Sequence, residues 1–289
     1  QVRLIKRIMK AQDVDEKKWP ARQAAWFING QKDEGKRAHE VASGEDLFQI
    51  THKRIYQAYE EVCDQGGLVD FAELLLRSHE LWLNDAQLLA HYQQRFSHLL
   101  VDEFQDTNTI QYAWLRVLAG QTSRVMAVGD DDQSIYGWRG AKIENIHQFT
   151  NDFAAVATVR LEQNYRSTQT ILQAANGLIQ RNTNRLGKEL WCHGDKGEPL
   201  KVYAGFNDLD EARFIAERIQ QWVEDGGSPN EAAILYRSNA QSRVLEEALL
   251  RLNIPYQIYG GQRFFERAEI KNALAYMRLM EDRHSDPAF

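Results

Sequence analysis

Phe96-Ser-His-Leu-Leu-Val101 passes directly into Asp102-Glu103-Phe-Gln-Asp106, and this junction is the strongest indication of the protein's architecture. The apolar run is typical of a buried strand, so the acidic residues after it are expected at the carboxyl edge of a parallel sheet, where open α/β folds bind ligands. One carboxylate at such an edge can hold Mg²⁺ on a nucleotide, and its neighbour can orient and deprotonate an attacking water. The plain alternative is that Asp102 and Glu103 only cap the next helix.

The rest of the chain beyond residue 96 continues this rhythm. Further short apolar runs suited to buried strands lie at 124–128, 156–161, 200–204, 232–236 and 256–259. Helical patterns lie between several of them, near 108–119, 168–181, 208–224 and 240–252. Strands alternating with helices of this length predict a parallel, doubly wound α/β sheet.

The first 95 residues show helical periodicity and almost no strand pattern. The clearest segment is 71–83, where helical spacing places six side chains on one face: Phe71, Leu74, Leu75, Ser78, Leu81 and Trp82. The stretch 264–281 is helical again. We therefore expect an α/β protein that begins with an all-helical part.

Composition limits the classes of protein to which the chain can belong. It has 289 residues, with 35 Lys+Arg against 41 Asp+Glu and 43% hydrophobic residues, which is ordinary for a globular protein. No apolar run approaches the roughly 18 residues of a membrane helix. Two cysteines cannot form a disulfide framework, so a cytoplasmic location is expected. The formal charge of −6 does not exclude nucleic acid as a partner, because a local groove can be basic.

A second strand-end loop follows the run at 124–128. It reads Gly129-Asp-Asp-Asp-Gln-Ser-Ile-Tyr-Gly-Trp-Arg-Gly-Ala141. Three consecutive aspartates are costly unless a cation or solvent faces them, and the amide of Gln133 is placed to sense a phosphate or water. Tyr136, Trp138 and Arg139 bring two aromatic rings and a guanidinium within four residues, a combination suited to stacking on bases and contacting a phosphate.

These strings carry a family resemblance. The segments 100–108 and 128–141 resemble motifs II and III of the superfamily 1A DNA helicases. Leu161-Glu-Gln-Asn-Tyr-Arg-Ser-Thr168 resembles motif IV, and Leu235-Tyr-Arg-Ser-Asn-Ala-Gln-Ser-Arg243 resembles motif IVa, in the family's order. The resemblance implies portions of two RecA-like, P-loop NTPase-type parallel-sheet domains with an N-terminal helical insertion. It also implies an ATP-dependent 3′–5′ single-stranded DNA translocase and helicase.

The resemblance assigns the residues of ATP hydrolysis. Asp102 is expected to hold Mg²⁺ and Glu103 to activate the hydrolytic water. Gln133 is expected to contact the γ-phosphate or its water. Tyr165 is expected to stack on the adenine of ATP, and Arg166 to act as an arginine finger on the γ-phosphate.

The resemblance also assigns the residues that contact DNA. Tyr136 and Trp138 are expected to stack on single-stranded DNA, with Arg139 supporting their loop. Arg243 is expected to order the second motor domain or to contact DNA. The implied partners are single-stranded DNA, its junctions with duplex, and proteins of mismatch and nucleotide excision repair, with no membrane involved.

The family's domain layout implies four parts. They are a helical 1B subdomain at 1–96, the second half of motor domain 1A at 97–162, the first part of domain 2A at 163–262, and the start of helical 2B at 263–289. We expect an internal fragment that lacks the Walker A loop and motifs V and VI and has little ATPase activity alone. Its 1A sheet is then incomplete.

One segment imitates the missing phosphate loop. Gly30-Gln-Lys-Asp-Glu-Gly35-Lys36-Arg37 fits the G-x-x-x-x-G-K pattern but continues with Arg where Ser or Thr would reach Mg²⁺. Asp33 and Glu34 would put negative charge inside a phosphate cradle. The segment is therefore predicted to be an exposed turn between helices.

Two other functions remain open from the sequence. A metal-dependent nuclease could use Asp102, Glu103, Asp106 and the cluster at 130–132 to hold two Mg²⁺ ions. A non-catalytic single-stranded DNA-binding or docking module would need only the exposed aromatic residues. Structural zinc is not expected, because Cys192-His193 has no second Cys/His pair at zinc spacing.

Overall fold

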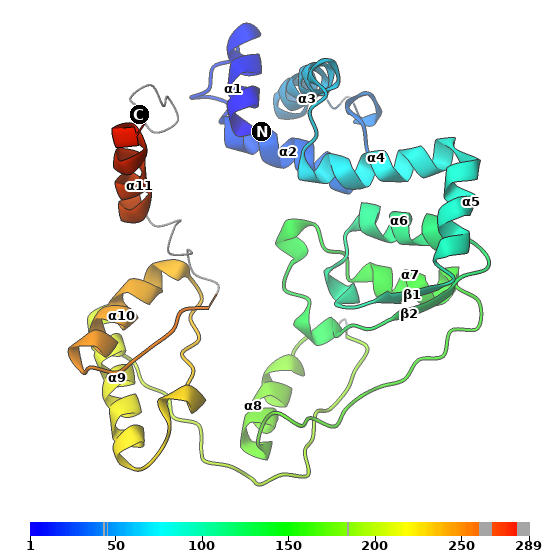
Figure 1. Ribbon diagram of the computed structural model, residues 1–289. Coiled ribbons are helices and arrows are strands. Elements are labelled where there is room, and N and C mark those ends of the chain that lie inside the picture. Colours follow the sequence, from blue (N-terminus) through cyan, green and yellow to red (C-terminus); the bar gives the residue numbers. More distant parts are fainter. Residues whose placement is uncertain (43, 45, 184, 260–267, 282–289) are drawn as a thin grey trace. The chain divides into compact units, whose positions relative to one another are not determined.

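The computed structural model describes residues 1–42, 44, 46–183, 185–259 and 268–281. The chain forms two compact units, Gln1–Gly197 and Glu198–Phe289. Figure 1 shows helices and a small sheet in the first unit and helices in the second. In the described ranges, no helix combines the length and apolarity needed to cross a membrane.

The first unit is a mixed helix and sheet structure. Its helices are α1 (Val2–Ala11), α2 (Ala21–Asp33), α3 (Leu47–Gly66), α4 (Phe71–Asn84), α5 (Ala86–Arg95), α6 (Thr109–Ala119), α7 (Glu144–Asp152) and α8 (Gln169–Ile179). Its strands are β1 (His98–Val101) and β2 (Arg124–Ala127), and its 3₁₀ turns are η1 (Ala38–Glu40), η2 (Phe104–Asp106), η3 (Asp131–Gln133) and η4 (Gly137–Arg139). The helical periodicity predicted for the first 95 residues is confirmed.

Helices α1, α2 and α3 pack around one apolar core because their buried side chains recur at helical spacing. Ile5, Ile8 and Met9 of α1 belong to one cluster of buried residues with Ile28 of α2 and Tyr56 of α3. This core holds the N-terminal helices together independently of the sheet.

The connection from α3 to α4 follows its sequence pattern. Helix α3 ends at Gly66 and is capped by Gly67, whose φ of +60° is a left-handed conformation that glycine adopts without steric cost. Helix α4 begins after Asp70, whose carboxylate accepts a hydrogen bond from the backbone N–H of Glu73 at 2.8 Å. The segment between the two helices is thus a glycine turn followed by an aspartate N-cap.

A buried ion-pair network orients α4. Glu73 accepts hydrogen bonds from Arg37 and lies 2.8 Å from Lys32 Nζ, and the Lys32 side chain is only 2% exposed. Burial by itself would raise the pKa of Glu73, but hydrogen bonds from Arg37 and Lys32 lower that pKa to about 2. Asp70 also pairs with Lys32, at 2.9 Å. Glu73 is therefore a charged group held inside the helical part.

The apolar face predicted for 71–83 is wrong in part. Trp82 is buried and packs against Trp114 of α6 with ring centroids 4.7 Å apart, but Phe71 is 91% exposed, and Leu74 and Leu81 are exposed as well. The buried side of α4 instead carries Glu73, because the Lys32 and Arg37 cations draw that carboxylate inward. Ionic pairing, rather than apolarity alone, sets the rotation of this helix.

The sheet consists of β1 and β2, which pair in parallel with Leu99 opposite Val125. Side chains from one face, Val101 among them, pack against Tyr112 of α6 and Phe149 of α7, and Figure 1 shows both helices beside the strands. Leu100, on the opposite face, is exposed. Parallel pairing brings the carboxyl ends of both strands to one edge, as the sequence predicts.

Four of the predicted strands are not strands in the described part of the chain. The segments 156–161, 200–204, 232–236 and 256–259 run without ladder partners there, apart from an isolated bridge between Gln163 and Trp191 just beyond the first of them. Alternate apolar residues in them are exposed, including Val159, Val202 and Leu235. A strand pattern specifies which face is apolar, but a ladder also needs a neighbouring strand to satisfy its backbone groups.

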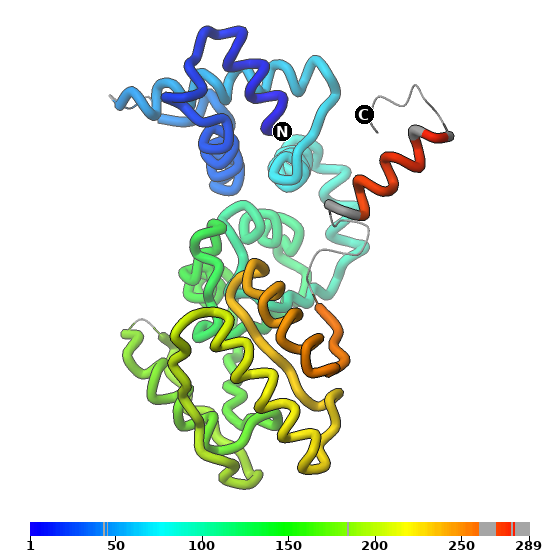
Figure 2. The backbone as a smooth tube through the Cα atoms, turned by 90° about the vertical axis from the view of Figure 1, so that its left-hand side faces the viewer, coloured from blue at the N-terminus to red at the C-terminus, as the bar shows by residue number. Residues whose placement is uncertain are grey.

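The second unit is built on a pair of packed helices, α9 (Asp208–Glu224) and α10 (Ser242–Arg251), with α11 (Ala268–Glu281) and the 3₁₀ turns η5 (Pro229–Glu231) and η6 (Asn239–Gln241). Figure 2 shows α9 and α10 side by side, and Ala212 and Ala216 of α9 and Leu249 of α10 are buried. The helices predicted near 108–119, 168–181, 208–224 and 240–252 are all present. Of the part assigned to 2B, residues 263–267 and 282–289 lie outside the described residues.

Candidate functional site

A backbone hydrogen bond joins the segments that follow β1 and β2. Phe104 donates its backbone N–H to the carbonyl of Val128 at 3.0 Å, and its ring is buried against Tyr112 and Phe149. Asp102 and Glu103 lie between the strand and this anchor and are exposed. Glu103 has a φ of +50°, which few non-glycine residues adopt and which often marks functional turns.

Gln105 is a buried amide that joins the two strand-end loops. Its side chain donates to the Glu103 carboxylate at 2.7 Å and accepts from the backbone N–H of Asp130 at 2.9 Å. The residue is 1% exposed. Sequence reasoning missed Gln105, although a polar residue directly after a buried aromatic in a strand-end turn is a signal that could have found it.

Gly129 allows the two loops to approach. A Cβ at this position would lie 2.8 Å from Gln105 Oε1 and 3.3 Å from Phe104 Cβ. Real Cβ atoms essentially never come as close as the first of these distances. The lack of a side chain at Gly129 therefore makes room for the Gln105 amide.

The three aspartates after Gly129 are faced by cations from a distant segment. Arg185 donates to the Asp132 carboxylate at 2.8 Å, and Lys188 pairs with Asp130. Burial by itself would raise the pKa of Asp130, but hydrogen bonds from Lys188 and Gln133 hold it below its usual value. Sequence reasoning expected a cation or solvent here but did not identify these residues. No local signal identified them, because Arg185 lies 53 residues further along the chain than Asp132.

Gln133 and the aromatic pair occupy the rest of this loop. Gln133 donates its side-chain N–H to the Asp130 carboxylate at 2.7 Å. The Arg139 guanidinium lies 4.6 Å from the Trp138 ring centroid and 4.9 Å from that of Tyr136, within cation–π range. Trp138 is 71% exposed. The structure thus brings Tyr136, Trp138 and Arg139 together as one group with an open aromatic face.

Tyr165 and Arg166 lie on a separate turn in the same unit. The Asn164 carboxamide oxygen accepts from the backbone N–H groups of Arg166 and Ser167, which fixes the turn. Tyr165 is 88% exposed, and Arg166 is exposed. Among the described residues, no hydrogen bond or ion pair joins this turn to Glu103 or Gln133.

Arg243 lies in the second unit, on the first turn of α10. It is exposed and pairs with Glu247 one turn along the helix at 3.1 Å. Within this unit, Arg243 is therefore an exposed side chain on the surface of α10.

The carboxylates differ in their fitness for Mg²⁺. Asp102 is exposed and, within the described ranges, has no cationic partner; its Oδ1 accepts only the backbone N–H of Glu103 at 2.9 Å. The buried Oδ1 of Asp106 has no hydrogen-bond partner, which leaves one unsatisfied carboxylate oxygen at this end of the sheet. Asp130 and Asp132 are already neutralised by Lys188 and Arg185. Mg²⁺ is usually held by one or two carboxylates together with substrate phosphates, and Asp102 fits that role.

The segment Gly30–Arg37 is not an exposed turn throughout. Its first four residues complete α2, and the turn is confined to 34–36, with Gly35 at φ +76°. Asp33 accepts from the Asn108 side chain at 3.0 Å, which fixes the start of α6. Since Arg37 and Lys32 also belong to the buried network around Glu73, the prediction of an exposed turn is wrong for them. The segment does not follow a strand, as a phosphate loop would.

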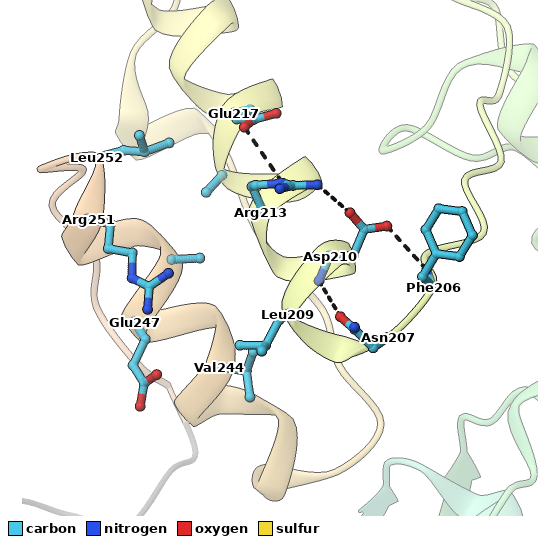
Figure 3. Close-up of a pocket in the computed structure, with 12 residues that line it drawn as sticks. Phe206, Asn207, Leu209, Asp210, Arg213, Glu217, Val244, Glu247, Arg251 and Leu252 are labelled. Carbon is cyan, nitrogen blue, oxygen red and sulfur yellow. Dashed lines mark hydrogen bonds and ion pairs between the residues drawn. The ribbon is translucent and has the colours of Figure 1, made fainter.

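A groove in the second unit lies between α9 and α10 (Figure 3). Several of the polar groups drawn there pair with one another: Arg213 contacts Asp210 at 2.6 Å, and Asn207 accepts from the backbone N–H of Asp210. The groove therefore offers few unengaged polar groups to a ligand, and the strand-end loops of the first unit are the better candidate site.

Comparisons with known proteins show the family of the chain. The UvrD/REP helicase N-terminal domain family matches residues 1–154, and the UvrD-like helicase C-terminal domain family matches residues 159–289. The chain is 63% identical over its whole length to DNA helicase II of Escherichia coli and 59% identical to DNA helicase II of Haemophilus influenzae. It is 38% identical, over 98% of its length, to ATP-dependent DNA helicase PcrA of Staphylococcus epidermidis. The chain spans about two fifths of the length of these relatives, 40%, 40% and 39%.

Proposed function

Because this chain belongs to the UvrD/REP helicase family, we propose that it carries part of the motor of an ATP-dependent DNA helicase that moves 3′ to 5′ along single-stranded DNA. The observation that carries the proposal is the joined pair of strand-end loops, in which Gln105 connects Glu103 to the loop at 129–133. In these loops a hydrolytic carboxylate and a phosphate-sensing amide belong to one hydrogen-bonded unit.

Glu103 is the proposed general base of ATP hydrolysis. The oxygen of a water attacks the γ-phosphorus while Glu103 takes the water's proton. The bond from the γ-phosphorus to the bridging oxygen breaks, and its electron pair leaves with ADP, so that the products are ADP and inorganic phosphate. Asp102 would hold Mg²⁺, which neutralises phosphate charge when it is bound.

The remaining residues of the reaction bind and orient ATP. Gln133 contacts the γ-phosphate or its water, Tyr165 stacks on adenine, and Arg166 stabilises charge on the γ-phosphate. The exposure of Tyr165 and Arg166 supports these roles, because neither is committed to the core. We expect the chain alone to hydrolyse ATP poorly, since Gly30–Arg37 does not form a phosphate loop.

Tyr136 and Trp138 form the proposed stacking surface for single-stranded DNA. The Arg139 guanidinium lies over both rings and supplies a cation for a phosphate. Stacking combined with a phosphate contact suits binding without base specificity. Arg243 is a further proposed DNA contact. Junctions of single strand and duplex are the proposed substrate, and the proteins of mismatch and nucleotide excision repair are the proposed partners, by resemblance to the family.

The family's layout is also proposed for this chain. Residues 1–96 would form a helical 1B insertion, 97–162 the second half of RecA-like domain 1A, and 163–262 the first part of RecA-like domain 2A. The segment 263–289 would begin 2B. The parallel pairing of β1 and β2 and the all-helical first 95 residues support this assignment.

The alternative of a non-catalytic DNA-binding module is favoured by one observation, the exposed aromatic group around Trp138. A two-metal nuclease is opposed by the ion pairs of Asp130 and Asp132, because these carboxylates already have cationic partners. A chimera in which this chain replaces the matching residues of Escherichia coli DNA helicase II distinguishes the motor from the binding module. A motor predicts hydrolysis of ATP that is stimulated by single-stranded DNA, and a binding module predicts none.

Substituting Trp138 tests the stacking surface. Trp138→Ala should weaken binding of the chain to a labelled oligothymidylate by about 1–3 kcal/mol, because one base loses its stacking partner. The measurement is fluorescence anisotropy at fixed salt. Trp26→Ala is the matched control, because Trp26 is 74% exposed on α2 and lies outside the group. Equal losses in both variants, or none at Trp138, would contradict the assignment.

A further inference from the structure

We propose that Gln105 is a positioning residue that holds the Glu103 carboxylate and links it to the loop carrying Gln133. The inference rests on the proposed function, because it takes Glu103 as the group that activates water. Gln105 acts through Glu103 and does not itself contact substrate.

The orientation of the Gln105 amide is fixed by its two partners. Its N–H group donates to a carboxylate oxygen of Glu103, at 2.7 Å, and its oxygen accepts the backbone N–H of Asp130, at 2.9 Å. A flipped amide would set oxygen against carboxylate oxygen and N–H against N–H. At a site that is 1% exposed, no water replaces those lost partners, so only one orientation is stable.

The same contacts continue to Gln133. Asp130, whose backbone N–H donates to Gln105, accepts the side-chain N–H of Gln133 on its carboxylate at 2.7 Å. A rotation of the loop that moves Gln133 therefore also moves the Asp130 N–H that donates to Gln105. Through Gln105 that movement reaches the Glu103 carboxylate. Gln105 thus couples the phosphate-sensing amide to the hydrolytic carboxylate.

A purely structural role for Gln105 makes a different prediction. In that case the amide only ties the two strand ends together, and its contact with Asp130 is sufficient. Gln105→Glu separates the two roles at a pH where the new side chain is ionised, since an ionised carboxylate still accepts from the Asp130 N–H but donates nothing to Glu103 and repels its charge. Gln105→Leu removes both contacts at similar volume.

The test uses the chimera with Escherichia coli DNA helicase II, with Gln105→Glu, Gln105→Leu, Glu103→Gln and the double variant of Gln105→Leu with Glu103→Gln. We expect both Gln105 variants to lower kcat for DNA-stimulated ATP hydrolysis by about 10- to 100-fold without raising KM for ATP, because the base is misplaced. The double variant should be no slower than Glu103→Gln alone, since Gln105 has no effect once the base is gone.

A second readout does not depend on activity. Hydrogen exchange of the Asp130 amide, measured in this chain without nucleotide, should be faster in Gln105→Leu than in the unsubstituted chain and nearly unchanged in Gln105→Glu. Gly129→Ala gives an independent perturbation, because its Cβ would displace Gln105 Oε1, and it should lower kcat in the same way. Thermal unfolding of each variant identifies any that fail to fold, and Gly129→Ala then takes the place of Gln105→Leu.

The outcomes separate this inference from the proposed function. Normal kcat in Gln105→Glu, or additive losses in the double variant, would overturn the positioning role while Glu103 stayed essential. Normal hydrolysis in Glu103→Gln would overturn the proposed function itself.

Discussion

Arg166→Ala lowers kcat for DNA-stimulated ATP hydrolysis in the chimera by about 10³- to 10⁵-fold, the range of a lost arginine finger. The expectation follows from the place of Arg166 on an exposed turn that Asn164 fixes through the backbone, which leaves the guanidinium to reach a ligand. Such a residue contacts charge that develops in the transition state, so kcat falls rather than the affinity for ATP. Steady-state kinetics with saturating oligothymidylate measures the effect.

Arg181→Ala is the matched control for Arg166→Ala. Arg181 is also exposed, just beyond α8, and no ion pair engages it in the part of the chain that the structure describes. It should hydrolyse ATP at the unsubstituted rate. A loss smaller than about tenfold in Arg166→Ala would remove this residue from the reaction, because an arginine finger is worth far more.

Glu73→Gln lowers the free energy of unfolding by about 3 kcal/mol, the low end of the range for breaking a buried ion pair. The side chain is buried among Lys32, Arg37 and Arg77, and neutralising it leaves their charges less well matched. The low end applies because Lys32 keeps Asp70 and Arg37 keeps Glu80. Urea unfolding followed by circular dichroism measures the change, with the exposed Glu61→Gln on α3 as the control.

The same residue predicts how stability depends on pH. Its pKa is lowered from 4.5 to about 2 in the folded chain, so its contribution is complete above about pH 4.5 and is lost as pH falls toward 2. The difference in stability between the unsubstituted chain and Glu73→Gln should therefore shrink as pH falls from 6 to 3. A difference that stays constant over this range would show that the charge of Glu73 contributes nothing.

The sequence predicted the elements that depend on local pattern. Helical spacing identified 71–84, 109–119, 169–179, 208–224 and 242–251 within two or three residues, because a helix satisfies its backbone within itself. Apolar patterns also predicted four additional strands that are not present in the described part of the chain, because a strand needs a neighbouring strand that no local pattern supplies. Helical spacing also misjudged the buried side of α4, where Glu73 is drawn inward by cations far away in the sequence.

The candidate site was predictable to the same extent. Asp102 and Glu103 were placed correctly at the sheet edge, because residues that directly follow a strand of a parallel sheet lie at its carboxyl edge. Gln105 was missed because its importance depends on the spatial neighbour Asp130, 25 residues away. Arg185 and Lys188 were missed for the same reason, since only the folded chain brings them to the aspartates.

We propose that the Glu103 carboxylate at the end of β1 activates water for ATP hydrolysis. The most direct test is the rate of DNA-stimulated ATP hydrolysis by the chimera with and without Glu103→Gln. We expect a loss of about 10²- to 10⁴-fold in kcat, the contribution of a general base, with binding of single-stranded DNA unchanged. Hydrolysis by Glu103→Gln at the unsubstituted rate would contradict it.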